Sequence, residues 1–206
     1  MKFYTIKTPS IIQRVFSGYR WRFSSVTKEI YLTFDDGPTP EITTFVLNEL
    51  KKHQAKATFF CIGKNVKNHP SIYERIKKEG HSVGNHTYNH LNGFRTNNIN
   101  YIENILQAEK LIESNLFRPP YGRLKSSQAR SIISKGYKII MWDVLSGDFD
   151  TTITPEKCLK NVLEKTTNGS IVVMHDSEKA KDKIFYTLPK ILSYYQEKGY
   201  LFKAIS

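Results

Sequence analysis

Two adjacent carboxylates, Asp35 and Asp36, follow an apolar run and are followed by Gly37 and Pro38. Neighbouring carboxylates repel each other unless a cation joins them, and a metal bound to one of them leaves the other available as a base. The alternative interpretation is an Asp-Gly turn whose acids are solvated, because Gly and Pro commonly turn the chain. Taken alone, the segment supports both interpretations equally.

Two histidines, His86 and His90, lie four residues apart. On one turn of helix both imidazoles would face the same way, which is a common chelating geometry. With Asp36 they make a facial set of ligands that leaves coordination positions open, as catalytic metal sites do. We expect one divalent metal at these residues. Zinc is favoured because it lowers the pKa of a bound water, and cobalt, nickel, manganese and iron are alternatives.

Strand-like and helix-like segments alternate along the chain, which predicts a parallel sheet in one α/β domain, either a barrel or an open sheet. In both architectures the site lies at the C-terminal ends of the strands. Strands are expected at 29–34, 57–60, 82–85, 116–118, 138–142, 170–174 and 200–204, and helices at 40–50, 71–78, 98–113, 127–135, 155–166 and 184–198. The polar residues that follow these strands are Asp35, Asp36, His86, His90, Arg118, Tyr121, Asp148, His175 and Asp176.

Several of these residues stand in ordered motifs: Thr33 to Pro38, His86 to His90, Arg118 to Gly122, and Val173 to Asp176. In kind and order they resemble the motifs of the polysaccharide deacetylases, which share the NodB homology domain and form carbohydrate esterase family 4. The resemblance runs from about Glu29 to the C-terminus. It implies a distorted (β/α) barrel with seven to eight mostly parallel strands. It also implies hydrolysis of N-acetyl, and sometimes O-acetyl, groups on polymers such as chitin or peptidoglycan.

Carried over to the matching positions, the resemblance implies that Asp36, His86 and His90 bind the metal. Asp35 would be the general base that takes a proton from the attacking water. The backbone N–H of Tyr121 would complete the oxyanion site.

The resemblance further implies that His175 is the general acid that protonates the leaving amine. Arg118 would hold Asp35 by a salt bridge and lower its pKa, and Asp148 would orient His175 and raise its pKa. Phe149 and Val173 would line a small apolar pocket for the acetyl methyl group.

The fourth motif departs from the family pattern, because Leu145 and Phe149 stand where the family often has Asp and Trp. Phe149 is a smaller ring without an N–H donor, so this motif leaves the choice of substrate open, and a substrate that differs from the usual polymers is an alternative. Asp143 and Asp150 lie nearby and are substitutes for Asp148 if the motif is aligned in another register. Both are expected to be solvated loop acids, since Asp is mostly exposed in proteins.

The chain carries 31 basic and 19 acidic residues, for a net charge of +12. The charge is spread along the chain and predicts a solvated basic surface suited to polyanions. Nucleic acid is not an expected partner, because no recognition motif accompanies the charge. The chain has only two cysteines, Cys61 and Cys158. They exclude a disulfide framework and a cysteine metal site as the main site.

Residues 1–28 are predicted to be a basic and aromatic extension packed on or near the domain at 29–206. No apolar stretch of signal-peptide or transmembrane length is present, which favours the cytoplasm as the default location. Within the extension, Ile11, Ile12, Val15 and Phe16 mix with arginines. This mixture makes peripheral contact with a membrane, such as its inner face, an alternative to packing on the domain.

The leading hypothesis is therefore a metal-dependent amino-sugar N-deacetylase that acts on an acetylated carbohydrate. An O-acetyl esterase or another small-amide hydrolase could use the same site. A catalytically dead carbohydrate-binding module predicts a missing acid or base, whereas Asp35 and His175 are both present. A nucleic-acid-binding protein predicts an affinity that falls steeply with salt.

Overall fold

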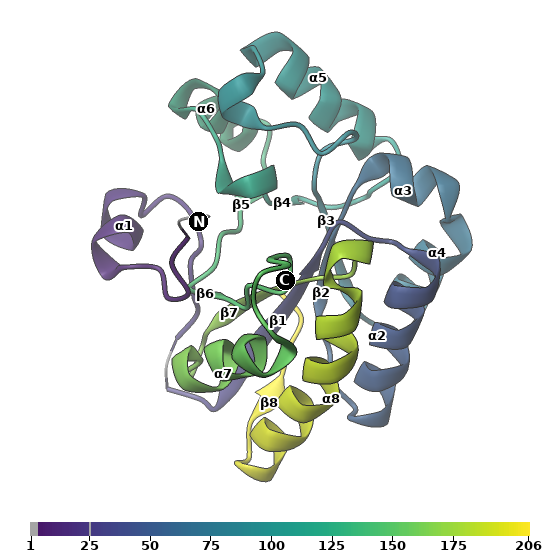
Figure 1. The fold of residues 1–206 in the computed structure, drawn as a ribbon. Helices are drawn as coiled ribbons and strands as arrows, with labels where there is room; N and C mark the ends of the chain where they lie inside the picture. Colours follow the sequence, from purple (N-terminus) through teal and green to yellow (C-terminus); the bar gives the residue numbers. More distant parts are fainter. Residues whose placement is uncertain (1–3, 25) are drawn as a thin grey trace.

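The protein forms one curled sheet with helices packed along it (Figure 1). The structure is a computed structural model that describes residues 4–24 and 26–206. The strands run in the order β5-β4-β3-β2-β1-β7-β6, with β8 beside β1, and all pairings between them are parallel. The predicted α/β class, with seven to eight parallel strands in a distorted barrel, is confirmed as a curled half-barrel.

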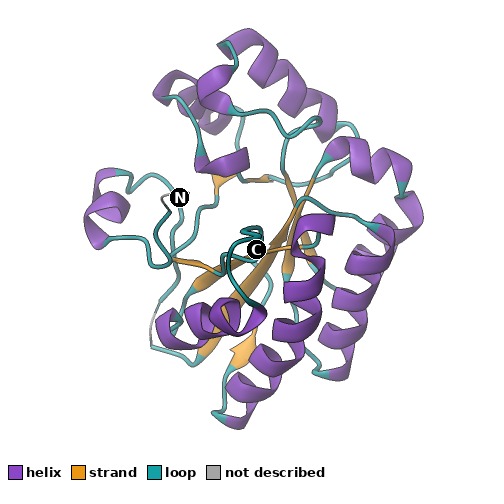
Figure 2. Cartoon of the chain, in the orientation of Figure 1, coloured by secondary structure: helices purple, strands orange, loops and turns teal. Residues whose placement is uncertain are grey.

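The strands alternate with helices for most of the chain (Figure 2). The strands are β1 Glu29–Asp35, β2 Thr58–Cys61, β3 Ser82–Asn85, β4 Leu116–Phe117, β5 Lys138–Ile139, β6 Val144–Leu145, β7 Ile171–His175 and β8 Leu201–Phe202. The α-helices are α1 Ser10–Val15, α2 Pro40–Lys52, α3 Gly63–Asn68, α4 Pro70–Lys78, α5 Asn98–Glu109, α6 Ser126–Ser134, α7 Pro155–Lys165 and α8 Lys181–Glu197.

The central strand is β1, which pairs with β2 on one side and β7 on the other. Its apolar side chains Ile30, Leu32 and Phe34 are fully buried, as expected for a parallel strand covered by helices. They pack in one core with apolar side chains of α2 and α8, including Leu47 and Leu188. This burial fixes the register of β1 and therefore the place where its two terminal carboxylates emerge.

Most predicted elements are confirmed, and the differences have local causes. The helix expected at 98–113 ends at Glu109. Helix α3 was not predicted, because its sequence Gly63–Asn68 is polar and carries no apolar period. Strand β6 at Val144–Leu145 was not predicted, because the strand expected at 138–142 ends before it and these two residues carry no strand-length apolar run. Cys61 and Cys158 are free, buried thiols.

The N-terminal segment lies along the two edge strands of the half-barrel, β5 and β6. Figure 1 shows this segment and α1, in purple, beside those strands. The N-terminal segment also forms isolated β-bridges with Val144, Ile140 and Ser170. The backbone hydrogen bonds run from Leu145 N to Ile6 O (2.8 Å), Thr8 N to Asp143 O (2.9 Å), Arg20 N to Ile139 O (2.8 Å) and Met141 N to Arg20 O (2.8 Å). The segment therefore joins both edges of the sheet.

The expectation that Asp143 and Asp150 are solvated loop acids is wrong. Asp143 is fully buried and Asp150 is 7% exposed. The Asp143 carboxylate accepts hydrogen bonds from Lys7 Nζ (2.7 Å), Ser170 Oγ (3.0 Å) and Ile171 N (3.0 Å). Both acids are covered because the N-terminal segment packs over their loop, which the local sequence does not reveal.

Helix α1 buries none of its residues. Ile11 is 62% exposed, Val15 is 67% exposed and Phe16, just after the helix, is 45% exposed. Within residues 4–24 and 26–206, no helix is long and apolar enough to cross a membrane.

Replacing Asp143 with Ala should lower the free energy of unfolding by about 1–3 kcal/mol, because the buried Ile171 N–H and the Ser170 hydroxyl lose this acceptor. The matched control is Glu164→Ala, which removes an exposed carboxylate from an ion pair with Lys160 on α7. The control should change stability by less than about 0.5 kcal/mol. Urea unfolding followed by circular dichroism measures both. Equal effects of the two substitutions would contradict the structural role of Asp143.

Candidate metal and acid–base site

The end of β1 turns sharply and presents Asp36 to a pocket. Asp36 has a φ of 84°, and the Gly37-Pro38 peptide is cis. The buried Asp176 carboxylate accepts hydrogen bonds from the Gly37 N–H (3.0 Å) and the Thr43 hydroxyl (2.5 Å). A Cβ on Gly37 would lie 2.0 Å from Asp176 Oδ2, so only glycine fits there. Burial raises the pKa of Asp176 to about 7.

His86 and His90 lie in a loop after β3, so the expected turn of helix is wrong. Thr87 and His90 have positive φ angles of 63° and 56°. The Asn85 side-chain oxygen accepts the Thr87 N–H (2.8 Å). Asn104 on α5 accepts the N–H groups of the next two residues at 2.9 and 3.0 Å. Side-chain amides thus replace the helical backbone bonds, as Asn commonly does in turns.

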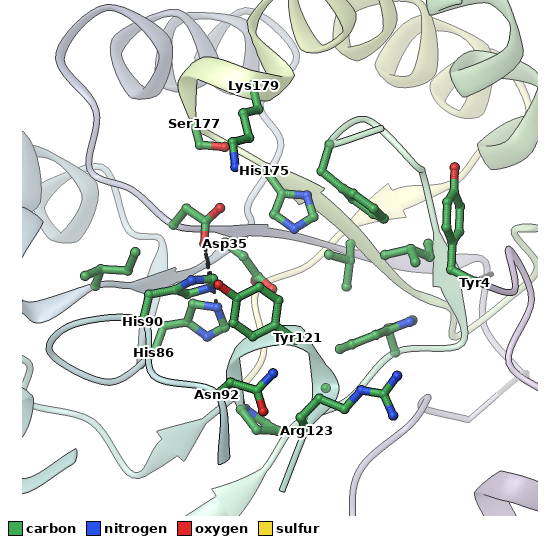
Figure 3. Close-up of a pocket in the computed structure, with 18 of the residues that line it drawn as sticks. Tyr4, Asp35, His86, His90, Asn92, Tyr121, Arg123, His175, Ser177 and Lys179 are labelled. Carbon is green, nitrogen blue, oxygen red and sulfur yellow. Dashed lines mark ion pairs between the residues drawn. The ribbon is translucent and has the colours of Figure 1, made fainter. Parts of the chain in front are cut away.

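The loop nevertheless brings the three predicted metal ligands together (Figure 3). One ligand atom each of Asp36, His86 and His90 lies within 4.8 Å of the others. Asp36 Oδ1 is 3.2 Å from His90 Nε2 and 3.8 Å from His86 Nε2. No residue in the described part of the chain forms a hydrogen bond with this buried oxygen. This unsatisfied carboxylate oxygen and the two imidazole nitrogens that face it form a ligand set suited to a divalent cation.

The surroundings of both imidazoles favour the neutral form, which can bind a cation. His86 Nδ1 is 2.8 Å from the Arg118 carbonyl oxygen, which leaves Nε2 facing the site. Burial and the neighbouring His90 lower the pKa of His86 to about 3, and burial also lowers the pKa of His90. Both rings are therefore neutral at pH 7, which is the form that binds a metal.

Asp35 is held by a buried arginine. Arg118 Nη1 lies 2.7 Å from Asp35 Oδ1 and 2.6 Å from Thr33 Oγ1. Its remaining nitrogens donate to the carbonyl oxygens of Ile140 and Met141, both at 3.1 Å. The guanidinium is fully buried, so this complete set of acceptors is what makes its burial tolerable. The carboxylate next to the metal ligands is thus fixed in position.

His175 ends β7 in register with Asp35 on β1. Its Nδ1 lies 2.7 Å from Asp148 Oδ1, and its backbone N–H donates to Asp148 Oδ2 at 2.7 Å. Burial alone would lower the pKa of His175, but the charge and hydrogen bond of Asp148 outweigh it and raise the pKa to about 10. The ring is therefore charged at neutral pH, and its Nε2 is left for the pocket.

The pocket above these residues has a volume of about 1000 Å³. Tyr121 is 61% exposed and its ring centroid lies 4.6 Å from that of His90. Phe149 packs 5.3 Å from His175, and Val173 also lines the pocket. Arg118 and Asp148 lie behind the lining, fully buried. All predicted site residues are thus gathered at one place.

Other lining residues were not found from the sequence. They come from several loops, and no motif or spacing connects them. They include Tyr4, Asn92, Phe94, Arg95, Arg123, Glu178 and Lys179. Asn85 and Asn104, which hold the histidine loop, were missed for the same reason. A polar residue at the end of a buried strand was the one available signal for Asn85.

A parallel half-barrel that carries a metal-ligand set, a base and an acid at its strand ends is suited to metal-dependent hydrolysis. Comparison with known proteins gives the family. Residues 24–140 match the polysaccharide deacetylase family model. A Bacillus cereus peptidoglycan-N-acetylglucosamine deacetylase is 33% identical over 197 residues, covering 92% of each chain. The chain belongs to the polysaccharide deacetylase family, whose members are metal-dependent hydrolases.

A second Bacillus cereus peptidoglycan-N-acetylglucosamine deacetylase is 36% identical over 155 residues. The match covers 72% of this chain and 56% of that relative, so the chain spans about half the relative's length. The crystal structure of the Bc1960 peptidoglycan N-acetylglucosamine deacetylase superposes with a TM-score of 0.85 at 31% identity, covering 96% of this chain and 95% of that chain. The similarity to this structure includes nearly the whole fold.

Replacing Asp148 with Asn should lower the pKa of His175 well below about 10, because the two largest effects that oppose burial, the charge and the hydrogen bond of Asp148, are lost while the charges of Asp36 and Asp35 remain. Histidine ¹H–¹⁵N NMR titration of the metal-free protein measures this shift, with the exposed Asp182→Asn as control. A His175 that still titrates near 10 in Asp148→Asn would contradict the assignment.

The same pair makes stability depend on pH. Because the folded-state pKa of His175 is raised, its stabilisation is present below pH 6.5 and is lost as pH rises through about 10. The difference in unfolding free energy between the unaltered protein and Asp148→Asn should therefore shrink as the pH is raised from 7 through about 10. Urea unfolding at several pH values measures it, and a constant difference would contradict the ion pair.

Proposed function

We propose that the protein is a metal-dependent hydrolase that removes N-acetyl groups from an amino-sugar glycan. The observation that carries the proposal is the pairing of two opposite electrostatic environments beside one metal-ligand set. Asp35 is held by Arg118, and His175 is held by Asp148. Amide hydrolysis needs such a pair, because the nitrogen is a poor leaving group until it gains a proton.

The residues divide the reaction between them. Zinc is the metal that we propose for Asp36, His86 and His90, and when bound it supplies Lewis-acid activation of water and of the acetyl carbonyl. Arg118 bonds to Asp35 Oδ1, so Oδ2 is available to take the proton from the attacking water. The backbone N–H of Tyr121 stabilises the developing oxyanion.

The second half of the reaction belongs to His175. Asp148 occupies Nδ1, so Nε2 is the nitrogen that can deliver a proton to the amine as the carbon–nitrogen bond breaks. Acetate and the free amino sugar are the products. A cation at Asp36 would oppose the raised pKa of His175 and bring it closer to neutrality, because like charges disfavour protonation.

We propose a peptidoglycan-like glycan as the substrate, with a chitin-like one as the alternative. The relatives named above support this choice. Three basic side chains, Arg95, Arg123 and Lys179, line the pocket. They suit a glycan that carries carboxylates, in keeping with the net charge of +12. Phe149 and Val173 both line the pocket, and in this proposal they receive the acetyl methyl group.

Replacing Asp35 with Asn should lower kcat/KM by about 10²–10⁴-fold, because the amide cannot accept the proton of the attacking water. Acetate release from N-acetylglucosamine oligomers and peptidoglycan fragments measures it, and Asp182→Asn is the exposed control. O-acetylated xylan provides the esterase comparison. A fully active Asp35→Asn enzyme would exclude this mechanism, and preferential release from xylan would favour the esterase.

We also propose peripheral contact of α1 with an anionic membrane, such as an inner membrane face. Exposed Ile11, Val15 and Phe16 beside basic residues support it. Val15→Asp should reduce sedimentation with phosphatidylglycerol vesicles severalfold. The control is Ile99→Asp, which alters an exposed apolar residue on a different helix, α5, and should not reduce sedimentation. Equal partitioning of both variants would contradict this contact.

A further inference from the structure

The pocket has an apolar end that lies across the sheet from the metal ligands. On β7, Val173 is two residues before His175, so both side chains lie on the same face. Leu145 on β6 is in register with Val173. Beyond β6, the Leu145 N–H donates to the Ile6 carbonyl of the N-terminal segment at 2.8 Å. The N-terminal segment is therefore the next chain outward from the site.

Tyr4 lies two residues before Ile6 and lines the pocket. Figure 3 shows its ring on the far side of the pocket from His86 and His90. The ring centroid is 5.1 Å from that of Phe149, which in turn is 5.3 Å from the His175 ring. Tyr4 thus extends the aromatic wall that begins at the acid.

A hydrogen bond to a buried carboxylate holds this ring in place. The Tyr4 hydroxyl donates to the buried Asp150 Oδ2 at 2.8 Å. Asp150 Oδ1 accepts the N–H (3.0 Å) and hydroxyl (2.8 Å) of Thr152. The same loop carries Asp148 and Phe149, so Tyr4 is anchored to the segment that supports the acid.

We propose that Tyr4, together with Phe149, closes the apolar end of the pocket and limits the length of the acyl group that the site accepts. Tyr4 is then a specificity-determining residue supplied by the N-terminal segment, outside residues 24–140 that match the family model. Phe149 is smaller than the Trp that the family often has there, and the Tyr4 ring lies against it. This inference rests on the proposed amide hydrolysis.

The test compares binding of acetohydroxamate and butyrohydroxamate to the zinc-loaded full chain by calorimetry. The unaltered protein should prefer acetohydroxamate. Tyr4→Ala should shift the affinity ratio roughly tenfold towards butyrohydroxamate, since each buried methylene is worth about fourfold. Tyr4→Leu should give a smaller shift in the same direction, and it retains an apolar anchor where Tyr4→Ala fails to fold.

Tyr4→Phe is the matched control, because it keeps the ring and loses only the hydrogen bond to Asp150. It should leave the ratio within about twofold of the unaltered protein. An unchanged ratio in both Tyr4→Ala and Tyr4→Leu would overturn the proposal. A shift in Tyr4→Phe as large as in Tyr4→Ala would also overturn it, since loop anchoring would then be the cause.

Turnover of N-acetyl and N-butyryl glucosamine oligomers is measured in parallel. A changed hydroxamate ratio without turnover of either oligomer would contradict the proposed deacetylation but retain the role of Tyr4. Turnover of the oligomers with the same hydroxamate affinity ratio in every variant would support the proposed deacetylation and contradict the role of Tyr4.

Discussion

The site depends on one buried guanidinium. Arg118 is fully buried, and its nitrogens donate to Asp35, Thr33 and two backbone carbonyls of the segment that follows β5. Its own carbonyl oxygen contacts His86 Nδ1 at 2.8 Å. A single residue after β4 therefore joins the base on β1, a metal ligand after β3 and the segment that follows the edge strand β5. Removing it would leave an unpaired buried carboxylate beside the metal ligands, so positioning and folding are coupled here.

The same side-chain type serves opposite purposes within this pocket. His86 and His90 are kept neutral mainly by burial, whereas His175 is kept charged by Asp148 despite burial. The difference comes from the residue behind each ring: a backbone carbonyl for His86 and a carboxylate for His175. Enzymes assign the roles of ligand, acid and base at one pH by placing titratable groups in environments that shift their pKa values in opposite directions.

The sequence predicted the parts of the fold that depend on local patterns. The apolar run of β1 and the starts of α2 and α7 at Pro40 and Pro155 could be predicted because burial and helix initiation act over a few residues. The motif residues were predicted together because parallel strands bring their ends to one edge. The two histidines were paired correctly although the local conformation was wrong, since Asn85 and Asn104 impose a loop from outside the motif.

Features that depend on distant contacts could not be predicted. The burial of Asp143 and the placement of Tyr4 both follow from the N-terminal segment lying along β6, about 140 residues away in sequence. Nothing in residues 4–8 specifies that pairing locally. The altered fourth motif was recognised from Leu145 and Phe149, but the ring that packs against Phe149 was not.

The most direct test of the account is a zinc titration of the metal-free chain, followed by calorimetry and by acetate release from N-acetylglucosamine oligomers. The account predicts one bound zinc per chain, activity that rises in step with occupancy, and affinity that falls by about 100-fold or more in Asp36→Ala. Zinc binding of unchanged affinity in Asp36→Ala, or full acetate release from the metal-free chain, would contradict it.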